Sequence, residues 1–302
     1  MTGSEQNLIS MRDAGMIDKE TFDLMWKDLH AEDTAASNPV QSDEAQTAGP
    51  AENISNSINL AAGAYSAKGI REQNEDSFFL GTETGGAKDA DGKSFSAQGD
   101  GPFFFAAADG MGGHGAGDAA SAFVVTKLKQ NASFQTTPVD DSRIEVILKA
   151  IHAELLADAV NRGTPKMGST VAGIILQKEN SGFFNAGDSR VYRLRHGYIQ
   201  QISEDDSLSR FVPGAAKNII TNAVGAGQEN INVASRFSSG FAVKGDIFLM
   251  CSDGVHGFIT DEELALFLNQ NDSPQEIAKL IVEKAIACNS DDNCTAVVVK
   301  YL

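Results

Sequence analysis

The sequence has few cysteines and none of the spacings that usually tie them together. Its three cysteines, Cys251, Cys288 and Cys294, are odd in number, lie in apolar surroundings and form no CxxC pair. The sequence therefore argues against a disulfide framework or a zinc ribbon, and it favours a reduced, cytoplasmic setting.

Long hydrophobic runs and positive charge are also scarce. No stretch reaches the roughly 18 apolar residues that a membrane-spanning helix needs, and the N-terminal residues lack the basic and apolar regions of a signal peptide. The 24 Lys and Arg residues are outnumbered by 41 Asp and Glu, which gives a net charge of -17. We therefore expect a soluble protein that binds neither nucleic acid nor an anionic membrane surface unaided.

Composition divides the chain near residue 58. No Lys or Arg occurs between Lys27 and Lys68, while acids accumulate among Ala, Ser, Asn and Gln. Such a segment cannot bury much apolar surface, so residues 31–57 are predicted to be an acidic flexible linker. Residues 1–30 are predicted to be a short helical element that docks to a partner or oligomerises, with an inert extension as the alternative. Residues 58–302 would then form the main domain.

The main domain is predicted to mix strands and helices. Runs of apolar residues predict strands at 60–66, 77–80, 103–108, 169–177, 182–186, 190–195, 231–238, 246–252 and 294–301. Helical spacing and capping residues predict helices at 116–131, at 142–162, after Thr260, and from Ser273 to about Cys288. Residues 81–102 are predicted to be an exposed hairpin insertion. Because strands and helices do not alternate regularly, antiparallel sheets covered by helices are favoured.

An apolar run ends in an acid and several glycines at residues 103–118, which read FFFAAADGMGGHGAGD. Gly110, Gly112 and Gly115 satisfy the spacing GxGxxG, which is typical of dinucleotide-binding turns. Asp109 argues against that function, since its carboxylate would repel a pyrophosphate. No GKS or GKT motif of a phosphate-binding loop occurs.

A metal site explains Asp109 better. Glu75 and Asp76, Asp253, and Asp292 likewise flank apolar runs, so the ends of several predicted strands carry carboxylates. Mg²⁺ and Mn²⁺ prefer carboxylate, carbonyl and water oxygens. The acids, together with the carbonyl of Gly110, are therefore predicted to converge on a site for such ions.

Six motifs give the chain a resemblance to the metal-dependent protein phosphatases of type 2C, and in particular to bacterial members. They occur in the family's order between Leu60 and Leu302 and read REQNEDS, ADGMGGHGAGDAAS, MGSTVAG, NAGDSRVYRLRHG, CSDGVHGFIT and SDDNCTAVVV. The resemblance implies an α+β fold, an α-β-β-α sandwich of two mainly antiparallel sheets flanked by helices. It also implies that residues 58–302 are a phosphatase domain.

The resemblance assigns two Mn²⁺ or Mg²⁺ ions to the acids. Asp109 matches the acid that bridges the two metals, and the carbonyl of Gly110 binds one of them. Asp253 and Asp292 match direct ligands of the other ion. The family's acidic pair that binds largely through water corresponds here to Glu75 and Asp76.

The resemblance further implies the reaction. Arg71 matches the arginine that grips the substrate phosphate, and with Asp109 it is a predicted catalytic residue. A metal-activated water would attack phosphorus and release a Ser or Thr hydroxyl and phosphate from a protein, which reverses Ser/Thr kinase signalling. The implied partners are phosphoproteins and a cognate kinase system.

Several residues depart from the family pattern or have a structural interpretation. Members of the family from animals carry a histidine directly after the Asp-Gly pair, but this chain has Met111 there. His114, three residues further on, is therefore only a candidate general acid, and bracing of the loop is the alternative role. The segment Arg162–Lys166 lacks the acid associated with a third metal, so a third ion is not expected. Asp188 is interpreted as a structural acid of a turn rather than a ligand. Ser252 and Asn293 are predicted to brace the neighbouring acids.

Two other functions compete with this prediction. One is a non-enzymatic regulator that uses the same fold only to bind phosphoproteins, and the retained acids and Arg71 argue against it. The other is a phosphatase dedicated to one small regulatory protein. Such enzymes often lack the phosphate-gripping arginine, which Arg71 supplies.

Overall fold

The computed structural model describes residues 19, 57–112, 116–133, 138–208 and 219–302. Contacts along the chain divide it into two units, Met1–Ile54 and Ser55–Leu302. All of the predicted N-terminal helical element except residue 19, and nearly all of the predicted linker, lie outside the described residues. The description below concerns the larger unit.

Two antiparallel sheets form the centre of this unit. The first has six strands in the order β10 (Tyr198–Gln201), β9 (Arg190–Arg195), β13 (Ile247–Cys251), β14 (Cys294–Tyr301), β1 (Ile58–Ala67) and β4 (Ala90–Gly99). The second follows the order β11 (Val224–Gly225), β6 (Gly168–Ser169), β5 (Phe103–Met111), β7 (Val171–Leu176), β8 (Gly182–Ala186) and β12 (Ala234–Phe237). Strand β2 (Asp76–Leu80) joins the second sheet beside β5 and also pairs with β3 (Glu83–Gly86).

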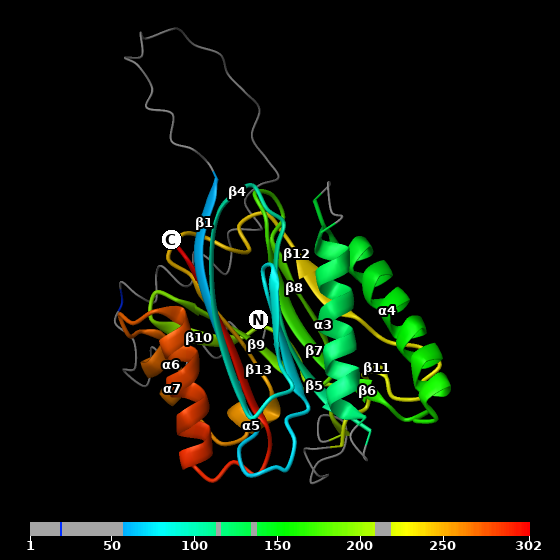
Figure 1. The fold of residues 1–302 in the computed structure, drawn as a ribbon. Coiled ribbons are helices and arrows are strands. Elements are labelled where there is room, and N and C mark those ends of the chain that lie inside the picture. Colours follow the sequence, from blue (N-terminus) through cyan, green and yellow to red (C-terminus); the bar gives the residue numbers. More distant parts are fainter. Residues whose placement is uncertain (1–18, 20–56, 113–115, 134–137, 209–218) are drawn as a thin grey trace, which may run out of the picture. The chain divides into compact units, whose positions relative to one another are not determined.

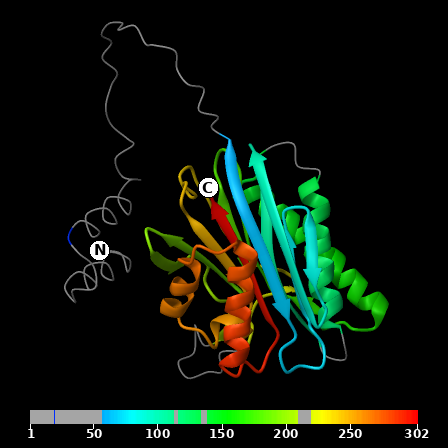
Figure 2. The ribbon, with the colours of Figure 1, turned by 60° about the vertical axis from the view of Figure 1, so that its left-hand side comes forward.

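Helices cover the outer faces of both sheets (Figures 1 and 2). Helices α3 (Gly117–Ser133) and α4 (Asp141–Arg162) lie over the second sheet, and α6 (Asp261–Leu268) and α7 (Pro274–Ala287) lie over the first. A short helix, α5 (Asp253–His256), follows β13 directly. The predicted α+β fold with an α-β-β-α order of layers is therefore confirmed.

The layers follow from how the apolar runs are buried. Along β5, Phe104 and Ala106 pack in a core with α3 and α4, whereas Phe105 and Ala107 pack between the two sheets. Side chains of a strand point alternately to opposite faces, so a strand covered on both faces is apolar throughout. A third core lies between the first sheet and helices α6 and α7.

Capping residues set the ends of the helices. Helix α4 begins after Asp140, whose side chain accepts a hydrogen bond from the backbone of Arg143, and it ends at Gly163 with φ 72°. Thr260 and Glu263 form a capping box on α6, and Ser273 caps α7 as predicted. The predicted bounds of α4 and α7 therefore agree closely with the structure.

The structure also contains elements that the sequence does not predict. The expected exposed insertion at 81–102 contains β4, which pairs with β1 along ten residues and forms the edge of the first sheet. Strand β5 continues past Asp109 to Met111, because Gly110 and Met111 pair with β6. Short strands such as β6 and β11 carry too few residues for a periodic pattern.

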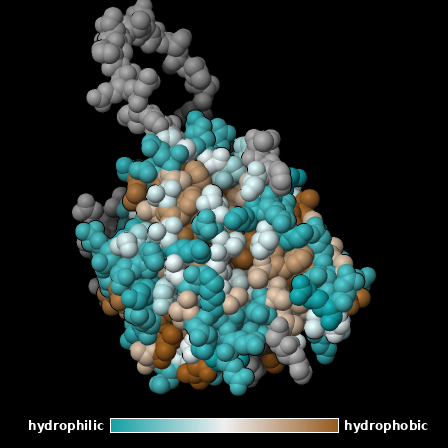
Figure 3. Space-filling view, viewed as in Figure 1, coloured by the Kyte–Doolittle hydropathy of each residue, from teal (hydrophilic) through white to brown (hydrophobic). Residues whose placement is uncertain are grey.

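The face of the described part that Figure 3 shows is mainly hydrophilic. In Figure 3, the hydrophobic residues visible on one face form small groups among hydrophilic ones. Among the described residues, no helix is long and apolar enough to cross a membrane.

A close contact between β1 and α7 gives a test of the packing. A methyl group on Gly63 would overlap the backbone of Gln275 in α7, and backbone atoms cannot rotate away as a side chain can. We expect Gly63→Ala to lower the free energy of unfolding by about 1–3 kcal/mol and Tm by roughly 3–10 °C in thermal denaturation. Ser94→Ala, at the exposed register partner of Gly63 on β4, is the control and should leave Tm nearly unchanged. An unchanged Tm for Gly63→Ala would contradict the packing.

Candidate active site

The predicted acids gather where the ends of the two sheets meet. In the second sheet, Asp76 at the start of β2 is the register partner of Asp109 in β5. From the first sheet, Asp253 lies two residues beyond β13 and Asp292 lies two residues before β14. The charges of Asp76, Asp253 and Asp292 all act on Asp109, so the structure brings the four side chains together.

Ser252 connects the two sheets at this point. Its hydroxyl donates a 2.7 Å hydrogen bond to Oδ2 of Asp76, and its Oγ accepts a 3.0 Å hydrogen bond from the backbone N–H of Thr295. Asp76 is fully buried. Ser252 therefore orients a buried carboxylate of one sheet from the end of a strand in the other.

Thr170 holds Asp109 through the main chain. The backbone N–H of Asp109 donates to the Thr170 hydroxyl at 3.0 Å, and the backbone N–H of Thr170 donates to the Asp109 carbonyl at 2.8 Å. The next residue must be a glycine, because a side chain on Gly110 would overlap the carbonyl of Gly117. The hydrogen bonds that hold the backbone of Asp109 thus do not involve its carboxylate.

The backbone of Glu75 is fixed at both its N–H and its carbonyl. The N–H donates to Oδ1 of Asn293 at 2.8 Å, and the carbonyl accepts from the Ser121 hydroxyl at 2.5 Å and from the Gly110 N–H at 3.1 Å. Its carboxyl group lies at the start of α3, where a side chain on Gly117 would overlap it. Burial raises the pKa of Glu75, and the Gly117 N–H opposes that rise.

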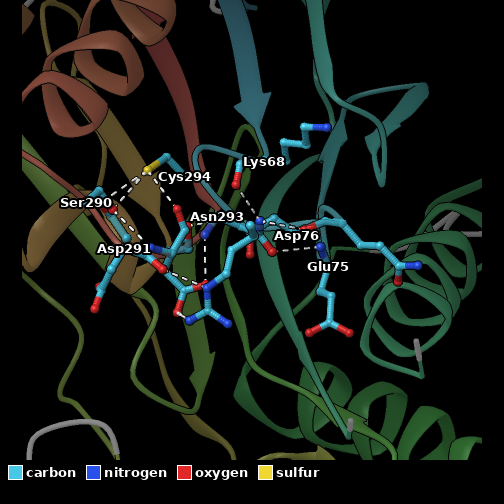
Figure 4. A network of polar contacts seen from close by, with 12 residues as sticks. Lys68, Glu75, Asp76, Ser290, Asp291, Asn293 and Cys294 are labelled. Atoms are coloured by element: carbon cyan, nitrogen blue, oxygen red, sulfur yellow. Dashed lines mark hydrogen bonds and ion pairs between the residues drawn. The ribbon is translucent and has the colours of Figure 1, made fainter. Parts of the chain in front are cut away.

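Asn293 clamps the loop that carries the predicted catalytic arginine. Figure 4 shows this network around Asn293. Its Nδ2 donates to the carbonyls of Lys68 and Gln73, each at 2.9 Å, so both ends of the loop are attached to the start of β14. The loop position is therefore tied to the residue that follows Asp292.

Arg71 lies in this loop beside the acids. Its NH2 group donates to Oδ2 of Asp292 at 2.7 Å, and its Nε donates to the carbonyl of Asp291 at 2.6 Å. Half of the Arg71 side chain is exposed. The guanidinium group is thus at the border between the carboxylates and solvent, where it can reach a ligand.

The carboxylates share an unfavourable electrostatic environment. Burial raises the pKa of Asp76 to about 7. The hydrogen bond from Ser252 opposes this rise, and the charge of Asp253 adds to it. Burial and then the charge of Asp76 raise the pKa of Asp109 well above its ordinary value. Burial also raises the pKa values of Asp253 and Asp292, with Arg71 opposing the rise at both. Protons or cations are needed to relieve this repulsion.

The chemistry of these donors fits a divalent cation. Oδ1 of Asp76 and Oδ1 of Asp253 are buried and have no hydrogen-bond partner. Unpartnered buried carboxylate oxygens are costly in a protein, and they are the ligands that Mn²⁺ and Mg²⁺ prefer. Within the described ranges, no three acidic, histidine or cysteine side chains already enclose a common ion position.

The other predicted residues have different outcomes. His114 lies outside the described residues. Ser252 and Asn293 both bond to the acids or to their backbone, as the sequence predicts. Thr170 and Ser121 were missed, because a hydroxyl that braces a backbone has no local signal in the sequence. Asp188 is buried with an unpartnered oxygen, which a simple turn residue does not explain.

The raised pKa values predict how the metal-free protein responds to pH. For Asp76 the pKa is about 7 in the folded state and near 3.8 as its ordinary value, so the folded state holds more protons between these limits. Stability must then fall as pH rises through this range. We expect Tm of the metal-free protein to be lower at pH 8 than at pH 5 by at least about 5 °C.

Asp76→Asn should flatten this dependence, because it removes one of the groups that take up a proton on folding. Asp140→Asn changes an exposed cap of α4 and should leave the slope as it is. A Tm that stays constant or rises from pH 5 to pH 8 would show that the acids are not buried together.

Comparisons with known proteins agree with this arrangement. The model of the family described as Protein phosphatase 2C matches residues 83–283, about two thirds of the chain. This range includes Asp109, Gly110 and Asp253, whereas Arg71 and Asp292 lie outside it.

Individual relatives are bacterial. The serine/threonine phosphatase stp of Listeria innocua is 28% identical over 210 residues, covering 64% of this chain and 82% of that protein. Serine/threonine protein phosphatase PstP of Mycobacterium tuberculosis is 28% identical over 242 residues, which cover 76% of this chain but 42% of the longer PstP.

Solved structures show the same fold. PppA, described as a key regulatory component of the T6SS in Pseudomonas aeruginosa, has a TM-score of 0.65 and 28% identity, covering 82% of this chain and all of PppA. The catalytic domain of PstP in complex with two manganese ions has a TM-score of 0.66 and 26% identity, covering 81% of this chain and 99% of that domain. Taken with the family match and the converging acids, these likenesses show that the chain belongs to the protein phosphatase 2C family and is a protein phosphatase.

Proposed function

We propose that this phosphatase removes phosphate from phosphoserine and phosphothreonine in proteins and depends on two Mn²⁺ or Mg²⁺ ions. The observation that carries the proposal is the group of mutually repelling carboxylates, of which Asp76 is fully buried, with unpartnered buried oxygens on Asp76 and Asp253. The relatives are serine/threonine phosphatases by name, which supports the substrate class. The two manganese ions bound by PstP support a centre with two ions.

The ions would be held by the acids that the sequence predicts. Asp109 and the carbonyl of Gly110 would bind one ion. Asp253 and Asp292 would bind the other, and Asp109 would be a ligand of both. Glu75 and Asp76 would bind largely through water molecules. Divalent ions at such a site lower the pKa of a water molecule and neutralise the charge of a phosphate group. A third ion is not part of the proposal, because residues 162–166 offer no acid.

The remaining residues have positioning and binding tasks. Arg71 would leave Asp292 and donate its planar set of N–H groups to the substrate phosphate, a pairing that suits a guanidinium group. The half-exposed position of Arg71 supports this task. Ser252 holds Asp76, and Asn293 holds the loop of Arg71, so both keep the reacting groups in place.

The setting of the enzyme is part of the same proposal. Residues 58–302 would be the phosphatase domain, with residues 31–57 a linker and residues 1–30 a docking or oligomerising element. The substrates would be phosphoproteins made by a Ser/Thr kinase of the same bacterial cell, in its cytoplasm. The two relatives named above are serine/threonine phosphatases, which supports a kinase counterpart.

Metal dependence is the direct test. Metal-stripped protein should release no phosphate from a phosphothreonine peptide, and Mn²⁺ or Mg²⁺ should restore release. Asp109→Asn should lower kcat/KM by at least about 100-fold in the presence of either ion, since it removes the shared ligand.

Asp140→Asn is the matched control, because it makes the same chemical change at an exposed helix cap and should keep full activity. Release of phosphate without added metal, or full activity of Asp109→Asn, would refute the proposed two-ion mechanism.

Arg71 can be tested separately through substrate binding. Arg71→Ala removes charge-assisted hydrogen bonds worth roughly 1.5–3 kcal/mol, so kcat/KM should fall about 10- to 100-fold, mainly through a higher KM. Arg71→Lys keeps the charge but not the paired donors, and should recover only part of the loss. Arg162→Ala, at an exposed ion pair on α4, is the control. A Mn²⁺ affinity that falls while KM rises would instead assign Arg71 to the metal site.

A further inference from the structure

A buried histidine supports the edge strand of the second sheet. Strand β11 is the last strand of that sheet on one side, and it contacts helix α4 (Figure 1). The N–H of Gly225 in β11 donates a 3.0 Å hydrogen bond to Nδ1 of His152, which lies on α4 and is 4% exposed. An unpaired N–H on a buried edge strand is costly, and no further strand is there to accept it. His152 therefore takes the place of a neighbouring strand.

The strands beside β11 lead to Gly110. Val224 of β11 pairs with Ser169 of β6, and Ser169 pairs in turn with Gly110 of β5. The residues next to these pair in the same order, so each contact of β6 is two residues long. Such a short strand depends on support from both of its neighbours. The backbone of Gly110, whose carbonyl is a proposed metal ligand, is therefore two strands away from the bond to the histidine.

Strand β11 is packed tightly between α4 and β6. Gly225 has a φ of 76°, and a side chain on it would overlap Leu155 of α4 and the carbonyl of Met167. The N–H of Ala226 donates to that same carbonyl at 2.8 Å. A displacement of Gly225 on loss of its bond to His152 would therefore also displace the segment that enters β6.

The bond between Gly225 and His152 requires a neutral imidazole ring. Because Nδ1 accepts, the ring proton is on Nε2, which is buried and has no hydrogen-bond partner. Burial lowers the pKa of His152, and the backbone carbonyls of Gln228 and Glu229 oppose that change. A second proton, on Nδ1, would place a donor against the Gly225 N–H and would create a buried positive charge.

The described elements that pack against His152 offer no charge to compensate this proton. Strands β11 and β6 contain no titratable side chain. The charged residues of α4 nearest to His152 in sequence are Lys149 and Glu154, which are exposed and form ion pairs with Glu145 and with Lys127 of α3. The side chain of Glu229, in the loop after β11, is exposed. Acidification must therefore weaken the support of β11.

We propose that His152 is a positioning residue of the phosphatase. Its neutral ring holds β11 and, through β6, the backbone at Gly110, so that kcat falls when the ring is protonated or its acceptor nitrogen is removed. The inference rests on the proposed function, in which the Gly110 carbonyl binds a metal ion.

The test compares two substitutions of His152 in the full chain, with a phosphothreonine peptide and saturating Mn²⁺. His152→Leu fills the site but removes the acceptor, and it should lower kcat at pH 7.5 by about 10-fold or more, because small misplacements of reacting groups are costly. His152→Asn places its Oδ1 as many bonds from the backbone as Nδ1 of the histidine. It should therefore keep kcat within about threefold of the wild-type value.

Two further readouts distinguish positioning from packing. Asparagine does not titrate, so the ratio of the wild-type kcat to that of His152→Asn should fall by about threefold or more from pH 7.5 to pH 5. Amide hydrogen exchange of the metal-free protein at residues 110–111 and 168–169 should be faster in His152→Leu by about fivefold or more at pH 7.5.

Gln177→Leu is the matched control. Gln177 is also 4% exposed, and its Oε1 accepts a backbone N–H, that of Val139, at 2.9 Å. It follows β7, at the opposite end of that strand from Thr170. Both leucine variants remove an acceptor from a buried N–H and should lower Tm by roughly 3–10 °C. Gln177→Leu should nevertheless keep kcat and the exchange at Gly110 within about twofold of the wild-type values.

The outcomes separate the inference from the proposed function. If His152→Leu keeps kcat as the control does, or if both leucine variants lose it equally, His152 has only a structural role and the inference is wrong. A ratio of wild-type to His152→Asn kcat that is constant with pH also refutes it, and this ratio decides alone if His152→Leu does not fold. If the wild-type protein releases no phosphate with Mn²⁺, the proposed function is wrong and the inference fails with it.

Discussion

Repulsion among buried and half-buried carboxylates is the constraint that the rest of this structure accommodates. Asp76 is fully buried, and the pKa of Asp109 rises because of burial and because of neighbouring acids. An uncompensated buried charge costs several kcal/mol or forces protonation. A fold selected for stability alone would replace such a group with apolar side chains. The acids are therefore best understood as half of an ion-binding arrangement whose other half is a cation.

The groups that hold these acids are mostly neutral. Ser252 and Thr170 use hydroxyls, and Asn293 uses its amide, to fix carboxylate or backbone positions. Neutral braces orient a carboxylate without cancelling its charge, so its full attraction for a divalent ion is preserved. Arg71 is the contrasting case, since its charge partly compensates Asp292 at the exposed border. Arg71 thus lies half exposed between Asp292 and solvent.

The sequence predicts the layers and the acids well because both have strong local signals. Strands covered on two faces, such as β5 and β14, are apolar runs, and acids placed directly beside such runs lie at strand ends. Strand β4 is predicted as part of an insertion because it is a polar, only partly buried edge strand. Pairing of distant segments is invisible to a local pattern.

The position of the site between two sheets makes its geometry a property of the whole sandwich. Ser252 reaches Asp76 across the layers, and Ser189, in the turn between the two sheets, contacts Thr170. Both bonds depend on the distance between the sheets, which the apolar core between them sets through residues such as Phe105 and Phe248. Close-packed cores resist small displacements. A substitution in this core that shifts one sheet would therefore move Asp76 and Asp253 relative to each other and weaken ion binding, even though it touches no carboxylate.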